Sequence, residues 1–278
     1  MSRRLFPRLA AAMAVFWLAA SATAAAADQL RVCADPNNLP FSNAAGEGFE
    51  NKLAEMVAHE LGNSGVSYTW HAQRRGFVRE TLKARLCDIV IGVPAHYDPV
   101  ETTRPYYRST YVFVSRADRG IDVASLTDDR LRRLSIGVHL IGDDGMNTPP
   151  ANALGQAGIT ANVRGFPIYG DYREDTPPAR LIEAVANGGI DIAVAWGPLA
   201  GYVAKSSPVP LRLTPVADGE RFAPLRFAFD IAMGVRRGDS EFRQQLDDII
   251  ARRAGDIRAL LESYGVPLVE PAARHAAD

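Results

Sequence analysis

The chain contains the same succession of elements twice, and this repeat restricts the fold more than any other feature. In the first half, a strand-like segment with turn residues after it (30–38) leads to a helix predicted over 49–61. Apolar residues recur there at helical spacing, and Gly62 follows as a stop signal. A second helix is predicted over 77–86, directly before the apolar strand "DIVIGV" at 88–93.

The second half repeats this order. The segment 134–145 is typical of a strand followed by a glycine-rich turn, and 177–187 is typical of a helix that begins at two prolines. The strand "DIAVAWGP" (191–198) then takes the place of "DIVIGVP" in the first half. Strands that alternate with helices indicate parallel sheets with helices on both faces. We therefore predict an α/β fold of two lobes, each with a parallel-rich sheet flanked by helices.

Two extended segments are suited to connect these lobes. "STYVFVSR" (109–116) leaves the first lobe, and "FAFDIAMGVRRGD" (227–239) returns to it, which gives a two-segment hinge beside an interlobe cleft. Apolar residues at helical spacing after the return predict C-terminal helices against the first lobe. The predicted divisions are 1–27 for an export signal, 28–115 for the first part of lobe 1, 116–227 for lobe 2, and 228–278 for the hinge return and C-terminal helices of lobe 1.

The N-terminus has the composition of a cleaved secretory signal. Arg3, Arg4 and Arg8 precede an apolar run (9–20), and small residues follow up to Ala27. A membrane span needs roughly 20 apolar residues, so the short run favours cleavage over a retained anchor. The arginines leave both general secretory and twin-arginine export open. We expect a periplasmic protein with no stable membrane insertion after cleavage.

Charge excludes one class of partner. Removal of residues 1–27 leaves 28 Lys and Arg against 32 Asp and Glu, a net charge of −4. Without a basic stripe, the chain lacks the counterion-release term that drives binding to phosphate backbones, so we expect no nucleic-acid partner.

The chain has two cysteines, Cys33 and Cys87. An oxidising compartment favours a disulfide between them. However, Cys33 is expected near the end of one strand and Cys87 at the start of another, and parallel strands could then hold the Cα atoms more than roughly 7 Å apart. The sequence leaves the bonded and the free states open.

The order of the pieces resembles the periplasmic solute-binding proteins of family 3, the polar amino-acid type, over nearly the whole mature chain. The matching segments are "DPNNLPF", "GEGFENKLAEMVAHELG", "LCDIVIGV", "RPYYRSTYVFV" and "MGVRRGDSEF". This resemblance implies the type II two-lobed binding-protein fold. Open parallel sheets bind ligands beyond the carboxyl ends of their strands, so the loops after the two equivalent strands are expected to face each other across the cleft.

Two departures from that family argue against capture of a free amino acid. In the amino-acid binders, an arginine after the first-lobe strand binds the ligand carboxylate, whereas "GVPAHYDPVETT" (92–103) contains no arginine. The second-lobe strand of those proteins ends at an aspartate that binds the ligand ammonium, and Trp196 stands at that place here. An amino acid would therefore bury two charges without partners, at a cost of several kcal/mol.

A narrower resemblance points to a partner. "RVCADPNNLPFSNAAGEGFENKLAE", "QRRGFVRETLKARLCDIVIGVP" and "TTRPYYRSTYVFVSR" are similar to the MxaJ and XoxJ type, which is associated with periplasmic quinoprotein methanol and alcohol dehydrogenases. The resemblance implies a non-catalytic accessory protein that binds, matures or activates the dehydrogenase, with its cytochrome as a further candidate partner, or that handles a small molecule for that system. The alternatives are an importer component for a solute that is not a free amino acid, and a cleft enzyme such as a dehydratase.

The residues expected at the cleft are aromatic and apolar more than charged. An apolar cleft suits a protein partner or an apolar ligand, and the bland alternatives are core packing for the aromatic residues and solvent exposure for the arginines. The candidates are Asp35, Asn37, Leu39, Phe41, Arg74, Arg75, Phe77, Pro94, His96, Tyr97, Tyr106, Tyr107 and Trp196.

Neither a metal nor a cofactor is expected. The histidines lack zinc-site spacing, and Asp143 and Asp144 lack the spaced oxygen ligands of a calcium loop. No nucleophile motif accompanies His96, so catalysis would need one cleft carboxylic acid as a proton donor. Asp35, Glu50 and Glu101 are the candidates for that role.

Overall fold

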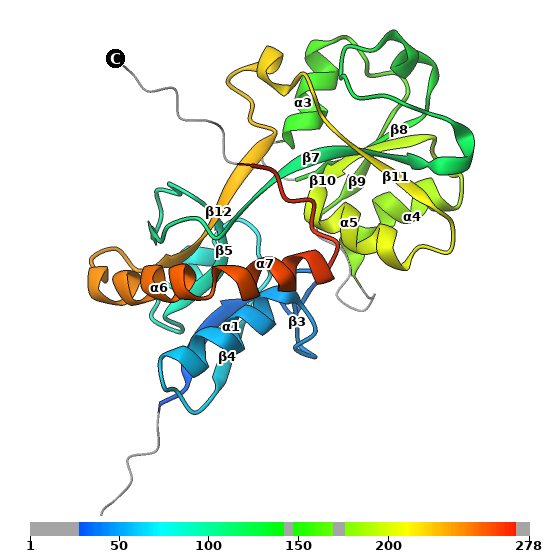
Figure 1. Ribbon diagram of the computed structural model, residues 1–278. Coiled ribbons are helices and arrows are strands. Elements are labelled where there is room, and N and C mark those ends of the chain that lie inside the picture. Colours follow the sequence, from blue (N-terminus) through cyan, green and yellow to red (C-terminus); the bar gives the residue numbers. More distant parts are fainter. Residues whose placement is uncertain (1–27, 142–146, 169–175, 271–278) are drawn as a thin grey trace, which may run out of the picture.

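The computed structural model describes residues 28–141, 147–168 and 176–270. The predicted export signal and the Asp143–Asp144 turn lie outside these ranges. Figure 1 shows two lobes, one holding helices α1, α6 and α7 and the other holding α3, α4 and α5, with strands β7 and β12 passing between them. The two-lobed α/β fold expected from the repeat is confirmed.

Lobe 1 is built on three parallel strands. β1 pairs in parallel with β4 on one side and with β5 on the other. The elements of this lobe are β1 (Leu30–Ala34), β2 (Asn37–Asn38), β3 (Ser42–Asn43), α1 (Phe49–Glu60), β4 (Val66–Trp70), α2 (Phe77–Glu80), β5 (Ile89–Pro94), β6 (Glu101–Thr102), α6 (Ser240–Arg252) and α7 (Ala254–Ser263). The C-terminal helices pack on this lobe as predicted, because Leu246, Ile250 and Ile257 join α1 in one hydrophobic core.

Lobe 2 repeats the parallel arrangement with β10, β8 and β9. Its elements are the short 3-10 helices η1 (Ala117–Arg119), η2 (Asp129–Arg133), η3 (Pro177–Ala179) and η4 (Gly219–Phe222), the strands β8 (Ile136–Leu140), β9 (Val163–Pro167), β10 (Ile192–Trp196) and β11 (Leu211–Pro215), and the helices α3 (Pro149–Gln156), α4 (Arg180–Ala186) and α5 (Gly197–Ser206). Two hydrophobic cores lie on the faces of this sheet.

The hinge strands β7 (Tyr107–Arg116) and β12 (Ala228–Val235) pair with each other in antiparallel register. β12 also pairs with β5, and β7 pairs with β10, so the sheets of the two lobes join in the order β4-β1-β5-β12-β7-β10-β8-β9. The two sheets expected from the sequence are therefore one hydrogen-bonded series of strands. This arrangement fixes the positions of the strand ends that surround the space between the lobes.

The second predicted helix of lobe 1 is much shorter than expected. α2 ends at Glu80, and the segment up to Leu86 consists of turns. The Thr81 hydroxyl donates to the carbonyl of Phe77, and Arg85 adopts a positive φ of 61°, which a continuing helix does not permit. Leu86, expected on the buried helix face, is 54% exposed.

Candidate functional site

The interlobe cleft is a cavity of about 330 Å³ between the carboxyl ends of β5 and β10 and the two hinge strands. Both lobes contribute to its walls, as the resemblance to binding proteins implied. The lining residues are Asn38, Phe41, Glu50, Gln73, Gly92, Val93, Pro94, Tyr107, Tyr111, His139, Ile168, Pro178, Trp196, Leu199, Phe229 and Ile231.

Aromatic side chains from lobe 2 and the hinge strands form one wall of this cleft. Trp196 is the last residue of β10, and its ring lies 5.4 Å from that of Tyr111 on β7 and 5.7 Å from that of Phe229 on β12. The two ring pairs are tilted or edge-on, which are favoured geometries for aromatic contacts. Trp196 therefore joins both hinge strands to lobe 2 at the cleft.

Glu50 places a buried carboxyl group in the lobe 1 wall. It follows Phe49 at the start of α1, and Asn51 fixes this helix start because its side-chain oxygen accepts from the backbone N–H of Gly48 and of Asn43. Glu50 is only 7% exposed, and its carboxyl lies over Gly92, where a Cβ atom would overlap Oε1. Burial, together with the nearby charge of Asp35, raises the pKa of Glu50 to about 8.

His139 is the titratable group on the opposite wall. It belongs to β8 of lobe 2, and its Nε2 lies 3.0 Å from the carbonyl oxygen of Pro178, so Nε2 carries the proton and donates. Burial lowers the pKa of His139 to about 4. Burial also raises the pKa of Tyr111. At neutral pH these three cleft groups are therefore uncharged.

The amino-acid clamp is missing from the described cleft. No Lys or Arg stands among its described lining residues, and Trp196 occupies the end of β10. The cleft therefore suits a ligand that needs aromatic contact and one or two hydrogen bonds more than one that needs two charge partners.

Four of the predicted site residues line the interlobe cleft, namely Phe41, Pro94, Tyr107 and Trp196. Asp35 is buried beside the cleft, where its carboxylate accepts from the backbone N–H groups of Asn37 and Gln73. Asn37 connects the lobes, because its side-chain oxygen accepts from the backbone N–H of Thr176 in lobe 2 at 3.0 Å.

The other predicted residues are placed elsewhere. Phe77 is a core residue and packs in the cluster that contains the two cysteines. Core packing was the alternative to a cleft position for this residue. Leu39 is half-buried in the turn after β2 and does not line the cleft. Arg74 and Arg75 are exposed before α2 and are also absent from its lining.

His96 and Tyr97 line a separate hollow, which we call the hinge groove. It has a volume of about 920 Å³ and lies between the loop 94–99, the hinge strands and the lobe 2 segment 216–227. Both residues are exposed, Tyr97 by 39%, and His96 has a positive φ of 62°. Pro94 lines both the hinge groove and the interlobe cleft. The residues after it in the loop, including His96 and Tyr97, line only the hinge groove.

Tyr106 turns toward the lobe 1 core rather than the cleft. Its hydroxyl is buried without a hydrogen-bond partner, and its ring lies 5.0 Å from that of Tyr107. Burial raises the pKa of Tyr106 well above its usual value. Of the tyrosine pair, Tyr107 alone lines the interlobe cleft.

Cys33 and Cys87 form a disulfide, with their Cα atoms 5.5 Å apart. The large Cα separation considered from the sequence does not occur. Cys87 lies just before β5, and β5 pairs with β1 beside Cys33. The bond lies in a small core with Phe77, Leu82 and Val93, and it ties the turn region after α2 to the central strand of lobe 1.

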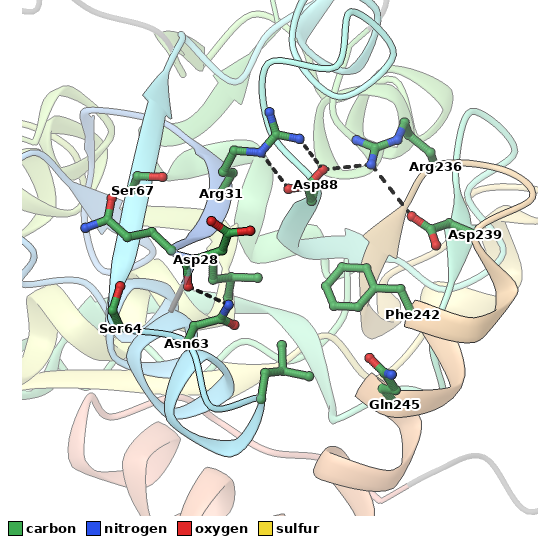
Figure 2. Close-up of a pocket in the computed structure, with 13 residues that line it drawn as sticks. Asp28, Arg31, Asn63, Ser64, Ser67, Asp88, Arg236, Asp239, Phe242 and Gln245 are labelled. Atoms are coloured by element: carbon green, nitrogen blue, oxygen red, sulfur yellow. Dashed lines mark hydrogen bonds and ion pairs between the residues drawn. The ribbon is translucent and has the colours of Figure 1, made fainter. Parts of the chain in front are cut away.

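A further hollow lies at the opposite edge of lobe 1, with a volume of about 970 Å³. It adjoins the start of β1, away from the strand ends that face the cleft. Figure 2 shows Asp88 between Arg31 and Arg236, which bind its carboxylate at 2.6 and 2.7 Å. These charges satisfy one another, so we regard the interlobe cleft as the functional site.

Two further features bear on function. Within residues 28–141, 147–168 and 176–270, no group of three or more His, Cys, Asp or Glu side chains is arranged to hold a metal ion. In the same part of the chain, no helix has the length and apolar composition needed to cross a membrane.

Several residues of the cleft were not predicted from the sequence. Tyr111, His139 and Phe229 were not among the predicted site residues, and Glu50 was considered only as a proton donor. Tyr111 and Phe229 lie in the two segments predicted to cross between the lobes, and this prediction was the available signal. Tyr111 stands opposite Trp196 because β7 pairs with β10, whereas the strand of Phe229 pairs with β7. The burial of Glu50 depends on the contact between α1 and β5 and has no counterpart in the local sequence.

Comparisons with known proteins agree with this architecture. Bacterial extracellular solute-binding proteins, family 3, match residues 30–266. Protein MoxJ of Methylorubrum extorquens is 34% identical over 262 residues, covering 90% of this chain and 85% of that protein. The crystal structure of periplasmic binding protein XoxJ from Methylobacterium extorquens AM1 is 37% identical, has a TM-score of 0.71, and covers 87% of this chain and 100% of that one.

The crystal structure of MxaJ from Methlophaga aminisulfidivorans MPT is 28% identical, with a TM-score of 0.74 and the same two coverages. This chain therefore agrees with these proteins in fold, in sequence and in length. The chain belongs to family 3 of the bacterial extracellular solute-binding proteins and, within it, to the MxaJ and XoxJ type.

Proposed function

We propose that this protein is a non-catalytic periplasmic accessory protein of a quinoprotein methanol or alcohol dehydrogenase system. The observation that carries the proposal is the similarity to MoxJ over 90% of the chain. The sequence motifs quoted above resemble the type associated with these dehydrogenases. The partner is the dehydrogenase itself, with its cytochrome as the second candidate.

The cleft supports this role over amino-acid transport. A transport protein for amino acids needs charge partners for both ends of its ligand, and the described lining offers no Lys or Arg for the carboxylate. The aromatic wall of Tyr111, Trp196 and Phe229 suits an apolar contact instead.

Reconstitution of the dehydrogenase tests this function. The apo-enzyme is incubated with its quinone and metal ion, with and without the mature accessory protein, and the recovered dye-linked alcohol oxidation is measured over time. We expect the accessory protein to raise the rate or the final yield of active enzyme. Equal rates and yields in both samples, and in a sample with serum albumin as a control, would contradict an accessory role in maturation or activation.

A second candidate is the binding component of an importer for a small solute that is not a free amino acid. The cavity of about 330 Å³ between the lobes favours it, since ligand sites of this family type lie there. A solute that contacts both lobes would favour the closed state. Small-angle scattering would then show a smaller radius of gyration with the solute, and an unchanged radius would count against this candidate.

A further inference from the structure

Glu50 is a buried acid that forms no hydrogen bond or ion pair with the described residues. The residue is only 7% exposed, and no side-chain hydrogen bond to its carboxyl oxygens is found within the described part of the chain. The carboxyl is held over Gly92 and lines the interlobe cleft. Polar groups in protein interiors normally have a hydrogen-bond partner, and the position of this carboxyl in the cleft lining lets a bound molecule supply one.

The groups around Glu50 do not provide a positive charge. The titratable residues that act on it or respond to it are Asp35, Tyr68, Tyr106 and Tyr107, and none of them is cationic. The Asp35 carboxylate accepts two backbone N–H bonds. Ionisation of Glu50 is disfavoured because the charge would be buried and because it would be repelled by Asp35. The Glu50 carboxyl therefore retains its proton and is a hydrogen-bond donor.

The other described residues that line the cleft are also uncharged at neutral pH. Rings of Phe41, Tyr107, Tyr111, Trp196 and Phe229 line it, and His139 on the far wall is neutral. A ligand with a full charge would lose its hydration in this cavity without gaining an opposite charge, which costs several kcal/mol. A neutral ligand avoids that cost.

We propose that the interlobe cleft binds a small, uncharged, largely apolar molecule with a hydrogen-bond acceptor, such as a carbonyl oxygen, and that Glu50 donates a hydrogen bond to this acceptor. The aromatic wall supplies the apolar contact, and Glu50 supplies the orientation. Such binding requires the cleft alone and does not depend on the dehydrogenase partnership. If the cleft binds no such ligand, the proposed partnership with the dehydrogenase is unaffected, and the reverse also holds.

Titration calorimetry with probes of similar size tests this ligand class on the mature protein. The neutral probes are acetophenone and cyclohexanone, and the charged probes are benzoate and benzylammonium. At pH 6.5 we expect saturable binding of at least one neutral probe and no binding of either charged probe. Because ionisation of Glu50 removes the donor, the affinity for the neutral probe is expected to fall about tenfold at pH 9.

Variants of Glu50 separate its hydrogen bond from its packing. Glu50→Gln retains an N–H donor and should keep affinity for the neutral probe within about threefold. Glu50→Ala should weaken it about tenfold. Glu55→Gln is the matched control, since Glu55 is exposed on the same helix, and its affinity should equal that of the unchanged protein. Circular dichroism of each variant confirms that it is folded.

Three results would overturn the proposal. The first is absence of binding by both neutral probes. The second is preferential binding of benzylammonium that tightens as pH rises and is lost in Glu50→Gln, which would assign a carboxylate and a cationic ligand to the cleft. The third is neutral-probe binding that Glu50→Ala leaves unchanged, because Glu50 would then make no bond to the ligand.

Discussion

At the scale of single residues, Glu50 makes the stability of the protein depend on pH. An unfolded chain ionises this carboxyl near pH 4.5, whereas the folded protein retains the proton to about pH 8. Between these values the folded state binds more protons than the unfolded state, so the free energy of unfolding falls as pH rises. This contribution is fully present below about pH 4.5 and is lost by about pH 8.

Glu50→Gln removes this titration. From pH 5 to pH 8, we expect the free energy of unfolding of Glu50→Gln to rise relative to that of the unchanged protein by several kcal/mol, since one pKa unit corresponds to about 1.4 kcal/mol. Urea denaturation at the two pH values measures the difference. Glu55→Gln serves as the exposed control, and a difference between Glu50→Gln and the unchanged protein that is constant across this range would refute the burial of a protonated Glu50.

His139 acts in the opposite sense. Its pKa is about 4 in the folded protein against 6.5 in an unfolded chain, so the unfolded state binds more protons between these values. The free energy of unfolding contributed by His139 is therefore lost as pH falls from about 6.5 to about 4. His139→Gln, which retains a donor for the Pro178 carbonyl, should lose less stability over this interval. The same loss in both proteins, measured by urea denaturation, would show that His139 does not carry this dependence.

At the scale of elements, the disulfide is expected to stabilise lobe 1 by restricting the unfolded chain. Cys33 and Cys87 are 54 residues apart, and closure of a loop of this length contributes about 2–4 kcal/mol. The double substitution Cys33→Ala with Cys87→Ala should lower the free energy of unfolding by about that amount. Reductant should lower it in the unchanged protein and have no effect in the variant. Equal stability of both proteins under oxidising conditions would contradict this contribution.

Helix α5 of lobe 2 meets the turn after helix α7 of lobe 1 through two glycines. A Cβ atom on Gly201 would overlap the carbonyl oxygen of Gly265, and the rings of Tyr202 and Tyr264 stack beside this contact at 6.0 Å. Gly201→Ala should therefore cost about 1–3 kcal/mol of unfolding free energy. Gly255→Ala is the matched control in α7, because its Cβ atom meets nothing within 4 Å and alanine favours helix. Similar thermal denaturation midpoints for both variants would refute the close approach.

The elements that the sequence predicted well are those with a strong local pattern. The strands β1, β5, β8 and β10 and the helix α1 lie where the repeat placed them. The helix expected over 77–86 failed because apolar spacing says nothing about the backbone of Arg85, whose positive φ is set by the surrounding fold. Phe77 was likewise predicted to line the cleft, but it belongs to the core around the disulfide.

At the scale of the whole molecule, the sequence predicted two lobes, a two-segment hinge and a cleft without the amino-acid clamp. The distribution of residues between the cleft and the hinge groove was not predictable. Pro94 and His96 are two residues apart, yet only Pro94 reaches the interlobe cleft. Which side of the hinge strands a loop residue faces depends on how β5, β12 and β7 are joined, and this pairing arises from segments far apart in the chain.

The central claim is that this two-lobed protein serves a quinoprotein alcohol dehydrogenase rather than amino-acid transport. The most direct test is calorimetric titration of the mature protein with a quinoprotein alcohol dehydrogenase from the same source, in its apo form and with metal and quinone bound. We predict saturable binding to at least one form, with a preference that distinguishes maturation from activation. Absence of binding to both forms would contradict the claim.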